Sequence, residues 1–495
     1  MNSILRVYAL AALCLAAAQA QSTNPLAWSR YLPGATYDVA KSVLVEPSGD
    51  VWVAGHSTAT YAAYGPNEPY QSINNGSSDI FLAKFRPLPD GTAITLFFTW
   101  LGGSGQEELA DMKQDSRGRI VLTGTTTSAN FPIAGSPLQT VFGGAIDVFV
   151  AVIDQTQGGA PSLAYSTYYG ATGQEMPRAL ALASNGNIAV VGDTTADDLP
   201  YVTTGAQPNR RGGTDAFMIV LNPDDGALRY ATYFGGGSTD TATGVAFDSQ
   251  NRVWFVGSTG SEDFPVTYNA IRLSSNGYLD AYLVGIDPAI SGLNGILYGT
   301  YIGGSGSDEA RGVAVDADSN IWVTGITFSD DFQVRDDAVQ PKFGGGTDAF
   351  LIKINPAIEG NDGLRYSTYL GGDGYEFVYG FRQIDKTHFG IAGYTMGGTL
   401  PTTSNAYRRL PVSVFADGFF GVINTGQAGR AGVEYLSYFG GSQTDVINGI
   451  DFDPANPKNI FFAGYTNSVD LPTTDDSVRT NAPPAPNAFV TKILR

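Results

Sequence analysis

A pattern of about 68 residues repeats seven times along the chain and leaves little of it over. Each unit carries two aromatic residues spaced as in Tyr-x-x-Tyr, with glycine close behind them. The second aromatic falls at Tyr31, Trp100, Tyr168, Tyr233, Tyr301, Tyr369 and Tyr438, at intervals of 69, 68, 65, 68, 68 and 69 residues. A period of this size is typical of an array of like supersecondary units, so it constrains the fold more than any other feature.

Each unit predicts four short strands. In the unit at residues 297–354, strands are expected at 297–302, 311–316, 321–327 and 348–354, with turn residues between them. No sustained helical periodicity follows the first twenty residues, and the composition is rich in glycine and aromatic residues. Four short strands per unit are typical of a propeller blade.

Two further landmarks keep the same register. A glycine within a predicted strand recurs at Gly55, Gly124, Gly192, Gly257, Gly325, Gly393 and Gly464. The last strand of each unit begins at Asp79, Asp147, Asp215, Asp280, Asp348, Asp417 and Asn487. The repeat is therefore regular in its strands as well as in its length.

The phase of the repeat predicts how the array closes. The chain enters on a Tyr-x-x-Tyr strand at residues 28–32 and leaves on an Asp-x-Phe strand at 487–494. If the small-residue strand lines the axis, the N-terminal strand completes the seventh blade beside the C-terminal one. We therefore predict one all-β domain over residues 25–495, a single seven-bladed β-propeller of four-stranded antiparallel blades closed by both chain ends in one blade.

The repeat units resemble a known family. Segments such as 366–372, 312–316, 321–325 and 348–354 are similar to the bacterial SBBP family of seven-bladed propeller repeats, and the resemblance covers essentially residues 25–495. It implies a secreted or surface-exposed β-propeller, and it implies no established reaction or ligand.

The first twenty residues have the layout of a signal peptide. Arg6 precedes an apolar run at residues 7–18, and Ala18-Gln19-Ala20 forms a small-x-small cleavage site before Gln21. The run is too short for a membrane span. Cleavage would remove Cys14, the only cysteine. We expect a protein with no membrane span that is secreted, periplasmic or at the cell surface.

The charge of the chain limits its partners. The formal net charge is −19. Such a surface repels phosphate backbones, so we expect no nucleic acid partner. Extracellular proteins, polysaccharides and cations remain open as ligands, and we expect a monomer.

A carboxylate follows each landmark aromatic by seven residues. The seven are Asp38, Glu107, Glu175, Asp240, Asp308, Glu376 and Asp445. Equal offsets in a closed ring predict equal positions around the axis on one face. Two interpretations follow: the carboxylates accept hydrogen bonds from turn amides and join blade to blade, or they hold a cation at the channel mouth, for which oxygen ligands suit Ca²⁺. Because the carboxylate recurs in every unit, it favours the structural interpretation, a role that every blade needs.

Enzymatic hypotheses find less support. The chain has two histidines, His56 and His388, and no Gly-x-Ser-x-Gly elbow or P-loop. Spacings between landmarks are nearly uniform, whereas catalytic propellers usually need unequal loops. We therefore expect a non-catalytic binding or scaffold module for a protein, glycan or cation. The alternative is an extracellular carbohydrate-active hydrolase or lyase that uses carboxylates of the ring.

The least regular loop lies in the first unit. It contains Tyr61, Tyr64 and Tyr70, and such side chains can stack on sugars or contact a partner protein. They can equally pack against their own blade. Both interpretations remain open from the sequence.

Overall fold

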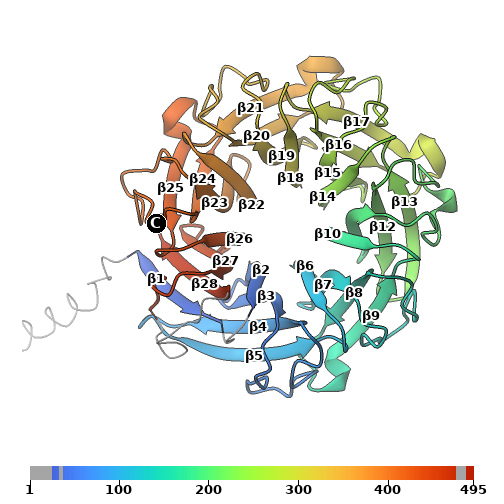
Figure 1. Ribbon diagram of the computed structural model, residues 1–495, viewed down its shortest axis with the longest axis vertical. Helices are drawn as coiled ribbons and strands as arrows, with labels where there is room; N and C mark the ends of the chain where they lie inside the picture. The colour runs from blue at the N-terminus through green and yellow to red at the C-terminus, as the bar shows by residue number, and fades with distance from the viewer. Residues whose placement is uncertain (1–24, 33–36, 475–485) are drawn as a thin grey trace, which may run out of the picture.

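The computed structural model describes residues 25–32, 37–474 and 486–495. These residues form seven four-stranded antiparallel sheets, arranged as blades around a central axis (Figure 1). The predicted all-β, seven-bladed propeller is therefore confirmed. The signal peptide predicted for residues 1–20, with Cys14, lies outside the described residues. Within those residues, no helix is both long and apolar enough to cross a membrane.

The blades follow one another along the chain. Blade 1 contains β2 (Asp38–Val45), β3 (Val51–Ser57), β4 (Asp79–Pro87) and β5 (Ala93–Leu101). Blade 2 contains β6 (Glu107–Gln114), β7 (Ile120–Thr126), β8 (Asp147–Ile153) and β9 (Leu163–Tyr169). Blade 3 contains β10 (Glu175–Leu182), β11 (Ile188–Thr194), β12 (Asp215–Asn222) and β13 (Ala227–Phe234). Blade 4 contains β14 (Asp240–Phe247), β15 (Val253–Thr259), β16 (Asp280–Ile286) and β17 (Ile296–Ile302).

The remaining blades repeat this order. Blade 5 contains β18 (Asp308–Val315), β19 (Ile321–Thr327), β20 (Asp348–Ile354) and β21 (Leu364–Leu370). Blade 6 contains β22 (Tyr375–Gln383), β23 (His388–Met396), β24 (Asp417–Asn424) and β25 (Val433–Phe439). Blade 7 contains β26 (Asp445–Phe452), β27 (Asn459–Thr466), β28 (Asn487–Leu494) and β1 (Leu26–Tyr31). Short 3₁₀ turns precede five strands: η1 (Ala160–Ser162), η2 (Val202–Thr204), η3 (Gly292–Gly295), η4 (Gly360–Gly363) and η5 (Gly429–Gly432).

The two chain ends close the ring, as predicted. β1 pairs antiparallel with β28, with Tyr31 opposite Phe489. Trp28 on β1 is fully buried, and its ring lies 6.0 Å from that of Phe85 in blade 1. The N-terminal strand therefore completes blade 7 and also contributes to the junction with blade 1.

The apolar core lies between the blades. The buried hydrophobic residues of the described chain fall into seven clusters, and each cluster joins two neighbouring blades. Most are β-branched and aromatic residues, which suit a pleated surface packed against another sheet. A single blade would leave one such face exposed, so the blades stabilise one another.

The landmark tyrosines hold the long loop of each blade. Tyr168 on the outer strand β9 donates its hydroxyl proton to the Ser128 carbonyl over 2.8 Å and accepts the Phe131 amide over 2.9 Å. Tyr369 likewise donates to the Ser329 carbonyl over 2.9 Å. In blade 1 the indole of Trp100 donates to the Tyr61 carbonyl over 3.1 Å. The aromatic landmark therefore fixes the loop that leads to the third strand.

The strand glycines face a β-bulge. In every blade the pairing of the innermost strand with the second strand shifts by one residue, immediately after the residue opposite the strand glycine. A Cβ on Gly325 would overlap the Glu309 carbonyl oxygen and the Phe350 ring. Glycine is needed here because the bulged strand presses its backbone against this position.

Candidate functional site

The seven predicted carboxylates lie at the start of the innermost strands, one per blade. Six are the first residue of their strand, and Glu376 is the second residue of β22. All seven are buried, none more than 1% exposed. They therefore encircle the axis at one end of the strands, as the equal offsets predicted, but their side chains lie within the protein.

These carboxylates cap the turn that enters each blade. Glu175 accepts the Ala171 amide at Oε2 and the Thr194 hydroxyl at Oε1, both over 2.9 Å. Glu107 and Glu376 likewise accept a turn amide and the hydroxyl of the threonine near the end of the second strand. Asp240, Asp308 and Asp445 accept a turn amide and the hydroxyl of a serine two residues beyond that strand. Asp38 accepts the hydroxyl of Ser57. The contacts are those of the structural interpretation, since they join the turn to two strands of one blade.

Each of six junctions pairs two carboxyl groups from neighbouring blades. Asp348 begins β20 in blade 5 and Glu376 lies in blade 6, and both approach Gly371 so closely that a side chain there would overlap them. Burial, and then the charge of Glu376, raises the pKa of Asp348 to about 7. Burial likewise raises the pKa of Glu175 to about 7 and that of Asp147 to about 6. The aspartates that begin the last strand of a unit, such as Asp79, therefore lie at the carboxylate ring, where each pairs with one carboxylate of the next blade.

Among the residues described, the carboxylate pairs of different junctions do not combine into a larger group of metal ligands. In residues 25–32, 37–474 and 486–495, no group of three or more histidine, cysteine, aspartate or glutamate side chains is placed to hold a metal ion. One carboxyl oxygen of Asp280 and one of Asp308 are buried with no hydrogen-bond partner in the described part of the chain. Ca²⁺ at the carboxylate ring therefore stays a prediction.

The tyrosines of the first loop pack against their own blade. Tyr61 lies 5.1 Å from the ring of Trp100, and Tyr64 stacks on Phe98 at 5.2 Å with an interplanar angle of 14°. Tyr70 is half-buried and packs on the cluster between blades 1 and 2. Only Tyr64 is exposed, at 36%. The three rings do not form one open surface.

The two histidines lie in different places. His56 is buried near the axis, where burial and the charge of Lys41 lower its pKa to about 3. His388 lies at the hairpin of β22 and β23, with Nδ1 2.8 Å from Asp385 and Nε2 3.0 Å from Glu434. His56 is neutral at ordinary pH. The Nδ1 of His388 also lies 3.2 Å from the hydroxyl of its chain neighbour Thr387.

A second ring of residues lines the central channel. The bulge in each innermost strand turns one side chain toward the axis, three residues after the carboxylate. These residues are Lys41, Ala110, Arg178, Thr243, Arg311, Tyr379 and Asn448. We call them the bulge ring. Sequence reasoning missed them because they share no chemistry, although the strand glycine fourteen residues later in six units is a known sign of a bulge.

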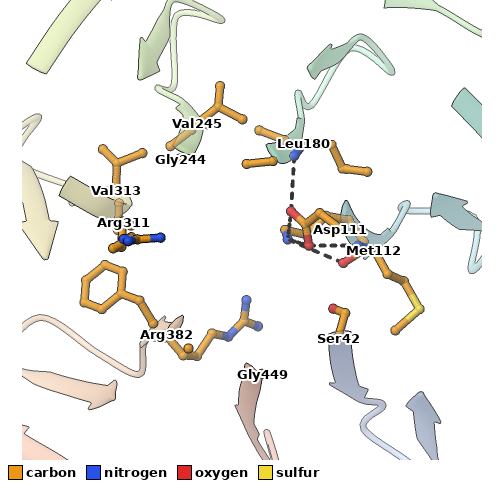
Figure 2. A pocket seen from close by; sticks show the side chains of 18 of the residues that line it. Ser42, Asp111, Met112, Leu180, Gly244, Val245, Arg311, Val313, Arg382 and Gly449 are labelled. Carbon is orange, nitrogen blue, oxygen red and sulfur yellow. Dashed lines mark hydrogen bonds and ion pairs between the residues drawn. The ribbon is translucent and has the colours of Figure 1, made fainter. Parts of the chain in front are cut away.

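The bulge ring separates two cavities along the axis. One has a volume of about 750 Å³ and the other about 630 Å³, and the residues they share are the seven of the bulge ring. The first cavity is lined by the later residues of the innermost strands. Figure 2 shows Arg311 and Arg382 pointing into it, with Asp111 across the channel. The second lies toward the carboxylate end and includes His56 and Tyr465.

The sequence matches a family model at one repeat. The model for the SBBP β-propeller repeat matches residues 297–333. Those residues span β17, β18 and β19, and the other units carry the same landmarks. Residues 297–333 are therefore an SBBP-type β-propeller repeat. The predicted family is therefore confirmed, and no curated protein matches the sequence.

The solved structures that are similar to this propeller have low sequence identity to it. A luciferin-regenerating enzyme is 11% identical, with a TM-score of 0.32, over 82% of this chain and 98% of that one. An aldose sugar dehydrogenase from Streptomyces coelicolor with bound PQQ is 11% identical, with a TM-score of 0.33, over 74% and 91%. An α-L-arabinofuranosidase from Fusarium graminearum is 9% identical, with a TM-score of 0.37, over 95% and 97%. Likeness at this level carries no argument about function.

Proposed function

We propose that this protein is a non-catalytic binding module, acting as a monomer outside the cytoplasm, that receives its ligand in the central channel. The observation that carries the proposal is the bulge ring. Seven equivalent backbone positions present dissimilar side chains to one channel, whereas the loops between strands are nearly uniform. Differences among otherwise equal blades are what a specific ligand requires, and in this ring they are concentrated at the axis.

The buried carboxylates support binding over hydrolysis. A glycoside hydrolase needs two carboxyl groups that reach the substrate. Glu175 and Asp240 are fully buried and already accept turn amides and hydroxyls. A location outside the cytoplasm rests on the signal peptide expected at residues 1–20 and on the acidic net charge of −19.

A blocked channel tests the proposal. Ala110 is the small member of the bulge ring, so Ala110→Trp adds bulk to the channel without removing a hydrogen bond. The control is Ala357→Trp, on an exposed turn. The mature protein is titrated with a set of soluble polysaccharides, sugars and organic acids while its melting temperature is measured, since bound ligand stabilises the folded state.

The outcomes separate the two functions. A shift in melting temperature that Ala110→Trp abolishes and Ala357→Trp retains supports a channel ligand. Equal shifts in both variants contradict it. Release of reducing sugar from any of the polysaccharides by the wild type, lost in Glu175→Gln, would establish the hydrolase instead.

A further inference from the structure

The bulge ring places three cations at one level of the channel. Lys41, Arg178 and Arg311 come from blades 1, 3 and 5, so one or two neutral side chains stand between successive cations around the ring. Together the two cavities are lined by five basic and three acidic residues, a net charge of +2 in a chain of −19. The channel is therefore opposite in sign to the protein as a whole, which favours entry of an anion.

The cations are incompletely neutralised by the protein. Within the described part of the chain, the Lys41 ammonium has neither a hydrogen bond nor an ion pair. Burial lowers its pKa, the charge of Glu108 opposes this, and the charge of Arg178 adds to it. Arg311 donates to Glu309 over 2.5 Å, but its Nε is buried without a partner among the described residues. Arg178 pairs with Asp193 over 2.9 Å. Lys41 and Arg311 are half-buried and Arg178 is exposed to the channel. An added anion would compensate the charge of the two partly desolvated cations.

Three neutral members of the bulge ring do not offer a free polar group to a ligand in the channel. Thr243 donates its hydroxyl to the Ala310 carbonyl over 2.6 Å, and the Asn448 amide donates to the Ala40 carbonyl over 2.8 Å. Both bonds join a blade to its neighbour, whereas Ala110 has no polar group. The side chains of Thr243 and Asn448 therefore bond neighbouring blades, whereas the three cations face the channel.

Aromatic side chains lie beside the cations on the carboxylate side. Tyr379 lies under the Arg311 guanidinium, 5.6 Å from the ring centre. Tyr37 stacks on His56 at 6.3 Å, and Tyr465 lines the same cavity of about 630 Å³. Among the residues that the structure describes, the buried Nδ1 of His56 and Oδ1 of Asn467 have no hydrogen-bond partner. Rings with nearby polar atoms suit a ligand that has both a ring and hydroxyl groups.

We propose that Lys41, Arg178 and Arg311 form the anion-binding centre of the channel, and that its ligand is an acidic sugar whose carboxylate or phosphate meets these cations while its ring packs among the tyrosines. This inference rests on the binding role proposed above and names the ligand class. The cations bind the acidic group by charge-assisted hydrogen bonds, which are stronger than neutral ones.

Calorimetric titration of the mature protein tests the site. The probes are glucuronate, glucose 6-phosphate, glucose and inorganic phosphate. We expect saturable millimolar or tighter binding of glucuronate or glucose 6-phosphate, weakened by added salt, and weaker binding of glucose. The first two probes distinguish a carboxylate from a phosphate. Inorganic phosphate binding as tightly as both acidic sugars would overturn the sugar assignment.

Charge-matched variants locate the site. Arg178→Gln and Arg311→Gln should each weaken binding of the acidic sugar by about tenfold or more. Arg229→Gln makes the same charge change on the outer strand β13 and should leave binding unchanged. Arg311→Lys keeps the charge and should retain most of the affinity. Unliganded melting temperatures show that each variant is folded.

Two results would overturn the anion site. One is the absence of saturable binding of both acidic sugars by the wild type. The other is unchanged binding in Arg178→Gln and Arg311→Gln. If a neutral glycan binds in their place and Ala110→Trp abolishes it, the binding function stands and only the anion site fails. If acidic sugars bind but Ala110→Trp does not change their binding, the ligand does not bind in the channel and the proposed location of the site is wrong.

Discussion

Asp348 of blade 5 and Glu376 of blade 6 are both fully buried and approach the same glycine, Gly371, at the junction between their blades. Each accepts hydrogen bonds: Gly344 and Gln340 donate to Asp348, and Gly372 donates to Glu376. The junction therefore combines satisfied polar groups with two acidic groups whose charges repel.

The paired carboxyl groups make the ring most stable in mild acid. Burial raises the pKa of Asp79, Asp147 and Asp445 to about 6 and that of Glu175 to about 7. The folded protein then holds protons that the unfolded chain has already released. Their stabilising contribution is complete below the ordinary carboxyl pKa and is lost as pH rises through about 6 to 7, so the free energy of unfolding falls between about pH 4 and pH 8.

Chemical denaturation at a series of pH values measures this trend. Carboxyl groups with a lowered pKa, such as Asp248 beside Arg252 and Trp254, act in the opposite direction only below their ordinary pKa of about 4. A denaturation midpoint that rises or stays level from pH 5 to about pH 8 would contradict the raised pKa values.

Replacing one partner by its amide should relieve the repulsion. Asn487 already occupies the corresponding position in blade 7. In Asp348→Asn the amide oxygen can still accept from Gly344, and the amide nitrogen can donate toward Glu376. We expect a gain of about 1 kcal/mol in the free energy of unfolding at pH 8 and little change at pH 5.

The matched variant Asp348→Ala removes the acceptor as well as the charge. It leaves the Gly344 amide and the Gln340 side chain without their partner, so we expect a loss of about 1–3 kcal/mol at both pH values. An Asp348→Asn variant that is less stable than the wild type at pH 8 would contradict the repulsion between the two carboxyl groups.

The strand glycine opposite the bulge should not tolerate a side chain. Gly325→Ala places a methyl group against the Glu309 carbonyl and the Phe350 ring, and we expect a loss of about 3 kcal/mol in the free energy of unfolding. Gly213→Ala is the control, because a Cβ there meets nothing within 4 Å. Similar melting temperatures for the two variants would show that the bulge is not a close contact.

Removing the closing strand should destabilise the whole ring. Trp28 is fully buried between blades 7 and 1, so Trp28→Ala should lower the free energy of unfolding by about 3–5 kcal/mol. Deletion of residues 25–31 should lower the melting temperature of a single cooperative transition. A truncated protein with unchanged melting temperature, or with fraying confined to blade 7, would refute closure by β1.

Much of the fold follows from the spacing of a few residues. Strands β19 and β20 coincide with the predictions, and β17 begins one residue before its prediction. β18 begins at Asp308, three residues before the predicted start at Arg311. The bulge at Arg311 interrupts the alternation of side chains, so the polar residues before it read as a turn although they pair with β19.

Less of the candidate site than of the fold could be predicted from the sequence. The offset of seven located Glu376 and its equivalents at one end of the ring, because equal offsets give equal positions. The carboxyl group that Glu376 meets at Gly371 is that of Asp348, a residue of another blade, and no local pattern reveals contacts between blades. The bulge ring was missed because Lys41 and Thr243 have nothing in common except the backbone position that aims them.

That backbone position has a consequence for related propellers. The bulge orients a side chain by main-chain geometry and a facing glycine, and neither depends on which side chain is present. Apart from Thr243 and Asn448, whose side chains bond to a neighbouring blade, the residues at these positions can therefore be exchanged without loss of a hydrogen bond between blades. Two chains with nearly identical blades could select different molecules, and comparing these seven residues would predict their specificity better than comparing the chains as wholes.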